Sequence, residues 1–167
     1  YQGQFGSGGL VGHSAINVDG KIYSFEGDGK WKEYSHDDYI KNESKTRVVI
    51  EQTVNVDQSK VQNILDNKKN GTYNVETNSC VTQTMNALKA GGIPLKTPNG
   101  AVSPEQLSNS LQNSKYVTNA TRTATTSQSS FVGQMLYNLI GGLFNYGVNA
   151  VGAKPNTAPL LDKEPAK

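Results

Sequence analysis

Two short runs near the start of the chain alternate hydrophobic and polar residues. They cover 13–18 (HSAINV) and 21–26 (KIYSFE), and the pair Asp19-Gly20 separates them. An Asp-Gly pair between two alternating runs is a strong signal for a β-hairpin with a two-residue type I′ turn. The pattern therefore predicts a hairpin over residues 13–27.

A two-residue turn fixes which side chains share a face of this hairpin. Counting outward from the turn, Val18 faces Lys21 and Ala15 faces Ser24, and the same count sets His13 opposite Glu26. One face, expected to meet the core, carries Ile16, Val18, Tyr23 and Phe25. The other face carries His13, Ala15, Ser24 and Glu26.

Later segments show the caps and the spacing of apolar residues that are typical of helices. Helices are expected to begin at Ser35, Asp57, Ser79 and the capping box Ser103-Pro104-Glu105-Gln106. The second should end near Asn70-Gly71 and the third at Ala90. A polar turn is expected over 27–32, and strands over 46–56 and 115–121. The expected fold class is α+β, a small antiparallel sheet packed against helices, with the helix near Cys80 against the hairpin.

Changes in composition divide the chain further. The expected parts are a Gly-rich leader 1–12, a catalytic domain 13–120, a linker 121–130, an apolar segment 131–153 and a disordered tail 154–167. The leader lacks the basic and apolar regions of a signal peptide, which suggests a cut or excised start. The stretch from Phe131 to Ala153 has no charged residue and about the length that spans a bilayer. Packing against the core or a partner protein is the favoured interpretation, because polar residues and glycines interrupt it.

Charge and cysteine content exclude several classes of function. Among 167 residues the formal net charge is only +2, which argues against nucleic acid as a partner. A single cysteine rules out an internal disulfide and any zinc site that needs two thiolates. The only histidines are His13 and His36, so a His-rich metal site is not expected either. We expect no metal and no organic cofactor.

Cys80 is the candidate nucleophile. Its predicted position at a helix N-terminus favours the thiolate, because free backbone N–H groups and the helix dipole stabilise negative charge there. The competing interpretation is a small buried hydrophobic residue on the core side of the helix.

His13 is the candidate general base for that thiol, and a third polar group would orient its ring. In the two-residue-turn register this group is Glu26, whereas a three-residue turn would favour Ser24. The competing interpretation of Glu26 is a solvated acid at a strand end. His36 is expected to be an exposed residue of a first helical turn.

These residues together resemble a known superfamily. The run Gly12-HSAINVDGKIYSFE-Gly27, the run Tyr73-NVETNS-Cys80 and a helix that ends in ALKAGG resemble the circularly permuted NlpC-type papain-like enzymes. That group includes PPPDE peptidases, LRAT-like acyltransferases and many bacterial toxin domains. Its members have a His at the start of a hairpin and an Asn-Cys motif at a helix start.

The resemblance covers about residues 10–115 and implies a role for each matching position. It implies a permuted papain-like fold, His13 as base, Cys80 as nucleophile, and Ser24 or Glu26 as the third polar residue. Asn78 and Ser79 fall on the motif beside the oxyanion hole, but Ser79 separates Asn78 from the cysteine. The backbone N–H of Cys80 is therefore the favoured oxyanion donor.

The resemblance also implies a biological setting. Such domains occur at the C-termini of Rhs and other type VI secretion effectors, which leave bacteria by contact-dependent systems without a signal peptide. The expected activity is antibacterial amide hydrolysis of peptidoglycan in a competitor's periplasm, and the expected partner is a cognate immunity protein. The alternatives are an LRAT-like lipase or acyltransferase acting on membrane lipid, and a non-enzymatic toxin that disrupts membranes through 131–153.

Overall fold

The predicted hairpin forms and belongs to a three-stranded antiparallel sheet. This computed structural model describes residues 12–45, 48–112, 114–123, 154 and 156–161. Strand β1 (Ala15–Val18) pairs with β2 (Lys21–Phe25), and β2 pairs with β3 (Trp31–Ser35). The register of β1 and β2 pairs Val18 with Lys21 and Ala15 with Ser24, which confirms that part of the prediction. The ladder ends at Ala15 and Ser24, before His13 and Glu26.

The turn at Asp19-Gly20 has the conformation that its sequence predicts. Asp19 has φ 50° and Gly20 has φ 82°, and a type I′ turn requires positive φ at both central residues. Strand β3, in contrast, begins within the polar turn expected over 27–32, so that prediction is wrong at its end. The adjacent residues Lys32 and Glu33 of β3 are charged and exposed, as is common in an edge strand. They interrupt the alternation of hydrophobic and polar residues by which a strand is recognised in a sequence.

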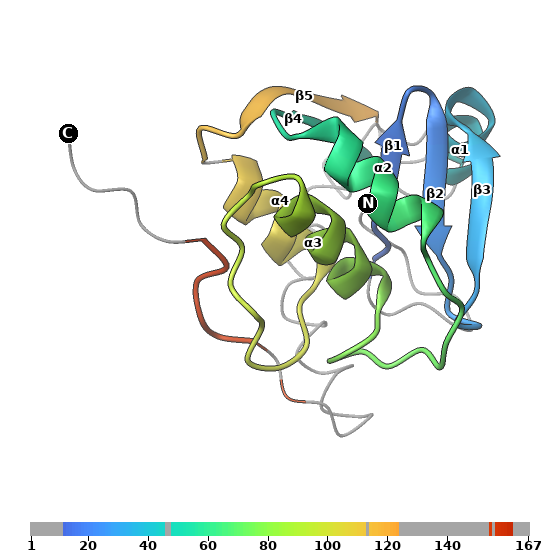
Figure 1. Ribbon diagram of the computed structural model, residues 1–167. Coiled ribbons are helices and arrows are strands. Elements are labelled where there is room, and N and C mark those ends of the chain that lie inside the picture. Colours follow the sequence, from blue (N-terminus) through green and yellow to red (C-terminus); the bar gives the residue numbers. More distant parts are fainter. Residues whose placement is uncertain (1–11, 46–47, 113, 124–153, 155, 162–167) are drawn as a thin grey trace.

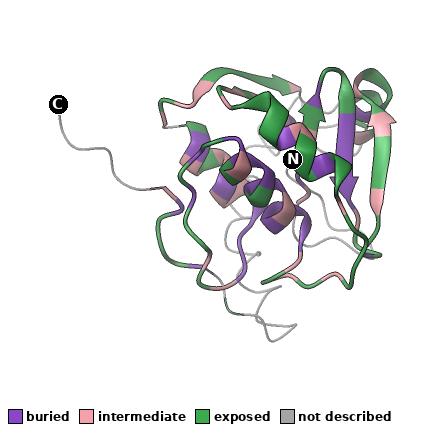
Figure 2. Cartoon of the chain, viewed as in Figure 1, coloured by how far each residue is buried: buried purple, intermediate pink, exposed green. Residues whose placement is uncertain are grey.

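Helices cover both faces of this sheet (Figure 1). Helices α2 (Gln58–Asp66) and α3 (Cys80–Ala90) lie on one face, and α1 (His36–Glu43) lies on the other. The first face packs into a cluster of Val18, Tyr23, Val61, Leu65 and Ala87. Because α1 covers the second face, Ser24 is fully buried at 0% exposure. Figure 2 shows β2 as mainly buried.

The predicted caps are present, whereas some predicted ends are not. Ser35, Asp57 and Ser79 cap α1, α2 and α3 through their side chains. Ser103 exchanges hydrogen bonds with Gln106 at the start of α4 (Pro104–Gln112), as in a capping box. Helix α2 ends at Asp66, short of the predicted end near residues 70–71.

A second, two-stranded sheet pairs β4 (Val49–Val54) with β5 (Val117–Thr123). Strand β4 confirms the strand predicted within 46–56. Strand β5 runs to Thr123, so the linker expected over 121–130 is wrong for its first three residues. The described elements make a mixed α+β fold, as predicted.

The larger core cluster includes a residue from near the end of the chain. Leu160, 3% exposed, packs with residues of α3 and α4 and with Leu95. The backbone N–H of Lys96 donates to the carbonyl of Leu160 at 2.9 Å, and Asn156 is buried as well. The disordered tail expected over 154–167 is therefore wrong for residues 156–161.

Other expectations fall on segments outside the described residues. These are the leader 1–12 apart from Gly12, residues 124–130 of the linker, the apolar segment 131–153, and 162–167. Within the described part of the chain, no helix has both the length and the apolar character needed to cross a membrane.

Candidate active site

Cys80 is the first residue of α3, as the cap pattern predicts. Ser79 accepts a hydrogen bond from the backbone N–H of Thr82, and its own N–H donates to the Thr82 hydroxyl at 2.7 Å. This capping box begins the helix at the cysteine and places the backbone N–H of Cys80 in the first turn. Cys80 is only 3% exposed and packs in the larger core cluster, so its polar contacts must distinguish a nucleophile from a buried apolar residue.

His13 supplies the first of these contacts. It lies two residues before β1, and its imidazole hydrogen-bonds the thiol of Cys80. The ring atom Nε2 lies 2.6 Å from the hydroxyl of Ser24. Because Nε2 is used by Ser24, Nδ1 is the ring nitrogen left to meet the thiol. The structure therefore joins Cys80, His13 and Ser24 in a row.

The surroundings of Cys80 favour its ionised form. Burial is the largest influence and raises the pKa of the thiol, whereas the charge and the hydrogen bond of His13 lower it. The backbone N–H of Ser14 and the hydroxyl of Tyr73 also stabilise the thiolate, and together these contacts lower the pKa of Cys80 to about 7. A reactive cysteine needs such a shift, because the thiolate is the nucleophilic form.

The surroundings of His13 favour its protonated form in the same way. Desolvation lowers the pKa of the half-buried imidazole, because protein atoms surround the ring. Cys80 opposes this through its charge and its hydrogen bond, and the carboxylates of Glu26 and Glu43 oppose it through space. The pKa of His13 is raised as a result. The two groups can thus form a thiolate–imidazolium pair.

Ser24, and not Glu26, contacts the imidazole. The carboxylate of Glu26 accepts a hydrogen bond from the hydroxyl of Tyr34 at 3.3 Å. The strand ladder ends before Glu26, which sets it outside the regular cross-strand position on which its predicted pairing with His13 depends. Its negative charge still raises the pKa of His13, so Glu26 acts on the ring at a distance.

Asn78 and Ser79 hold the loop before the helix and do not contact His13. The side-chain N–H of Asn78 donates to the carbonyl of Thr72 at 2.8 Å, and its oxygen accepts from Gln83 at 2.6 Å. Both ends of the amide are therefore used in fixing the loop. Ser79 is committed to the helix cap.

Tyr73 is a candidate site residue that the sequence reasoning missed. Its hydroxyl lies 3.7 Å from Sγ of Cys80 and receives a hydrogen bond from the backbone N–H of Cys80. Its ring stacks on Phe25 with centroids 6.0 Å apart. Burial and the neighbouring Cys80 raise the pKa of Tyr73, so the phenol keeps its proton. The only sequence signal was a tyrosine at the start of the polar loop before the cysteine.

His36 takes part in a different group of side chains. Its Nδ1 lies 2.9 Å from Asp37 and its Nε2 lies 2.6 Å from Glu51 of β4. The predicted position in the first turn of a helix is correct, although the ring is only partly exposed. His36 therefore links α1 to the second sheet.

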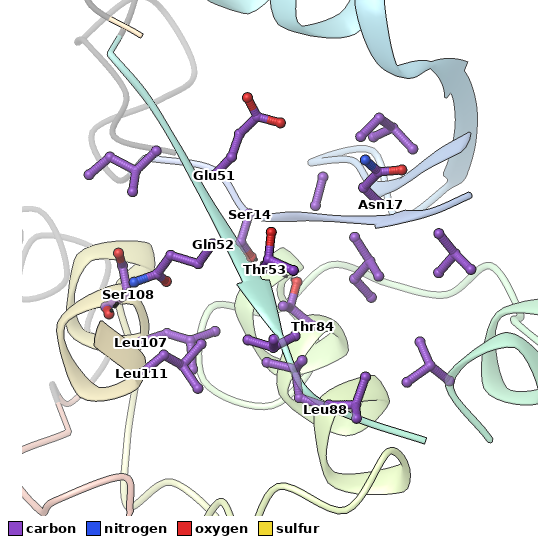
Figure 3. A pocket seen from close by; sticks show the side chains of 18 of the residues that line it. Ser14, Asn17, Glu51, Gln52, Thr53, Thr84, Leu88, Leu107, Ser108 and Leu111 are labelled. Atoms are coloured by element: carbon purple, nitrogen blue, oxygen red, sulfur yellow. Dashed lines mark hydrogen bonds between the residues drawn. The ribbon is translucent and has the colours of Figure 1, made fainter. Parts of the chain in front are cut away.

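A cavity of about 390 Å³ is lined by residues of β1, β4, α3 and α4 (Figure 3). Ser14 and Thr84 line it, and their hydroxyls hydrogen-bond at 3.0 Å. Neither Cys80 nor His13 lines this cavity. Ser14 follows His13 in the chain and the Thr84 hydroxyl donates to the carbonyl of Cys80 at 2.9 Å, so these two cavity residues adjoin the Cys80–His13 pair.

Within the described ranges, no group of three or more His, Cys, Asp or Glu side chains could hold a metal ion. Comparison of the chain with family models, with curated proteins and with solved structures found no match.

Proposed function

We propose that this protein is a thiol-dependent hydrolase in which Cys80 is the nucleophile and His13 is the general acid and base. The observation that carries the proposal is the row Cys80–His13–Ser24, in which the imidazole hydrogen-bonds the thiol and lies 2.6 Å from a buried hydroxyl. A cysteine buried only for packing needs neither an imidazole beside its sulfur nor a buried hydroxyl that holds that imidazole.

The first half of the proposed reaction forms an acyl-enzyme. The thiolate of Cys80 attacks the carbonyl carbon of an amide, and a C–S bond forms while the carbonyl oxygen becomes an oxyanion. The backbone N–H of Cys80 and the hydroxyl of Tyr73 are the donors proposed for that oxyanion, which then replaces the Tyr73 oxygen as the acceptor of the Cys80 N–H. The imidazolium of His13 then gives its proton to the amide nitrogen, the C–N bond breaks, and the amine leaves a thioester on the sulfur.

The second half hydrolyses the thioester. Neutral His13 takes a proton from a water molecule, whose oxygen attacks the thioester carbon. The C–S bond breaks, the acid product leaves, and the proton held by His13 restores the thiolate–imidazolium pair. Ser24 holds the imidazole in one orientation through both halves, and the carboxylates of Glu26 and Glu43 stabilise its positive charge.

The substrate class rests on the resemblance to permuted NlpC-type enzymes. We propose amide bonds in peptidoglycan peptides as the substrate, and a secreted antibacterial toxin acting in the periplasm of a target cell as the setting. A cognate immunity protein in the producing cell belongs to the same proposal. Membrane lipid is the competing substrate, and the experiment below assays it in parallel.

The test incubates purified protein with peptidoglycan sacculi and, in parallel, with phospholipid vesicles. We expect soluble muropeptides with new peptide ends from wild-type protein and none from Cys80→Ala or His13→Gln. His36→Gln is the matched control and should release the wild-type amount, because its ring lies in a separate group of side chains. Release of fatty acid or lysolipid from the vesicles, with intact sacculi, would show that the substrate is membrane lipid and not peptidoglycan. Muropeptide release by Cys80→Ala would refute the mechanism.

A further inference from the structure

The hydroxyl that contacts His13 has a second neighbour on the helix that covers the sheet. Ser24 of β2 points toward α1, where its Oγ lies 3.4 Å from the phenol oxygen of Tyr39. Ser24 is 0% exposed and Tyr39 is 5% exposed. The row that starts at the thiol therefore continues through a buried hydroxyl pair into α1.

The direction of the hydrogen bonds along this row follows from the chemistry of the imidazolium. When His13 is protonated, Nε2 carries a hydrogen and must donate to the Ser24 oxygen. Ser24 then has to aim its own hydrogen at another acceptor. Within the described residues, the Tyr39 oxygen is the acceptor within hydrogen-bonding reach of that hydroxyl.

We propose that Tyr39 is a positioning residue for the Cys80–His13 pair, because it accepts the hydrogen of Ser24 and so keeps the Ser24 oxygen turned toward Nε2–H. Without this acceptor, the Ser24 hydroxyl can turn and donate to Nε2. Such a bond stabilises neutral imidazole with its hydrogen on Nδ1, and that form cannot take a proton from the thiol. The inference rests on the proposed function, since it gives His13 the role assigned there.

Charged and titratable groups around His13 fit the same assignment. Ser24 is neutral and cannot supply the negative charge that a triad carboxylate gives to its histidine. Glu26, after β2, and Glu43, on α1, supply that charge through space, and Cys80 supplies it from α3. Orientation and charge, which a single carboxylate combines in many triads, are thus divided between a hydroxyl chain and two acids.

The test follows ionisation of the single thiol and needs no substrate. Alkylation of Cys80 by iodoacetamide is measured against pH for wild-type protein, Tyr39→Phe, Ser24→Ala and the double variant. We expect Tyr39→Phe to move the midpoint upward by about half a pH unit to one unit, since a neutral hydrogen bond is worth about that much. The double variant should titrate like Ser24→Ala, because Tyr39 acts only through Ser24.

Tyr34→Phe is the matched control. The Tyr34 ring packs against Tyr39 with centroids 5.0 Å apart, but its hydroxyl bonds Glu26 and not Ser24. Its titration should shift less than that of Tyr39→Phe. The inference would be overturned if the alkylation midpoint of Tyr39→Phe equalled that of wild type. It would also be overturned if the midpoint shifts of the two single variants added up in the double variant. A shift as expected in a protein that leaves sacculi intact would uphold it and reject the proposed substrate.

Discussion

Two residues compete for the role of third group beside His13, and they act on the ring in different ways. Ser24 touches the imidazole at 2.6 Å, whereas Glu26 bonds Tyr34 and reaches the ring only through its charge. Contact should matter for orientation, and charge should matter for the pKa of the imidazole.

The corresponding variants should therefore separate these effects. We expect Ser24→Ala to lower kcat/KM on the cleaved substrate by about 10-fold or more, the value of a hydrogen bond to a charged group. Glu26→Gln should cost less in rate at neutral pH. It should lower the pKa of His13, because a negative charge beside the cation is lost. The alkaline limb of the pH–rate profile should then move to lower pH.

Steady-state rates over a range of pH check both expectations. An unchanged alkaline limb in Glu26→Gln would show that this carboxylate does not act on His13. A larger loss in Glu26→Gln than in Ser24→Ala would return the orienting role to the acid.

At this scale the sequence pointed to Cys80, His13 and the choice between Ser24 and Glu26, because hairpin register and helix capping are local rules. It could not choose between the two, since the ladder stops two residue pairs before Glu26, and only the three-dimensional structure shows where it stops. The sequence could not identify Tyr73 and Tyr39 as site residues for a related reason. Their contacts with the site depend on packing between elements, which no spacing along the chain encodes.

Among the elements, the β2–β3 turn and the loop before α3 meet at two glycines. Gly29 has φ 76°, and a Cβ there would overlap the carbonyl oxygen of Gly71. The backbone N–H of Gly71 donates to the Gly29 carbonyl at 2.9 Å. This close approach fixes the start of the loop that carries Tyr73.

We expect Gly29→Ala to destabilise the protein more than Gly20→Ala. Both glycines have positive φ, but a Cβ on Gly20 would meet no atom within 4 Å. Gly20→Ala should cost about 1–2 kcal/mol for the backbone conformation alone. Gly29→Ala adds the displacement of the loop at Gly71. Urea unfolding of both variants measures the difference, and equal losses would contradict the close approach.

His36 should make stability depend on pH. The hydrogen bonds that its ring donates to the carboxylates of Asp37 and, second in size, Glu51 raise the pKa of its imidazole in the folded protein. The stabilisation is therefore fully present below the unfolded pKa of about 6.5 and is lost as pH rises through the raised folded value.

His36→Gln should consequently be less stable than wild type at about pH 5.5, by up to about 1 kcal/mol for a partly exposed pair. The difference should shrink in alkaline solution. Unfolding curves at acid and alkaline pH measure it. A deficit that grows with pH would show that the His36–Glu51 contact has another basis.

Helix starts were the most predictable elements, because Ser35, Asp57, Ser79 and Ser103 are caps whose chemistry is local. Strand β3 was hidden by the charged residues Lys32 and Glu33. Glu33 bonds both Lys21 and Lys68, so its charge belongs to an exposed ion-pair network on the strand edge and not to a loop.

At the scale of the whole molecule, α3 joins the two halves of the structure. Its Ala87 packs under the three-stranded sheet, while its Met85 and Leu88 pack with α4 and Leu160. The hairpin and helix-cap patterns predicted an α+β fold, but they could not predict that residues 156–161 return to this core. Three prolines and a high polarity near the chain end indicate disorder, and the burial of Leu160 and Asn156 is a long-range effect.

The central claim is that Cys80 and His13 form a thiolate–imidazolium pair, and the ionisation of the thiol tests it most directly. Because the chain has a single cysteine, the pH dependence of thiol alkylation by iodoacetamide reports on this group alone. Wild-type protein should titrate with a pKa of about 7. His13→Gln should titrate well above that value, because only the Ser14 N–H and the Tyr73 hydroxyl then oppose the effect of burial. A wild-type midpoint at or above the ordinary thiol pKa of about 8.5, unchanged in His13→Gln, would contradict the account.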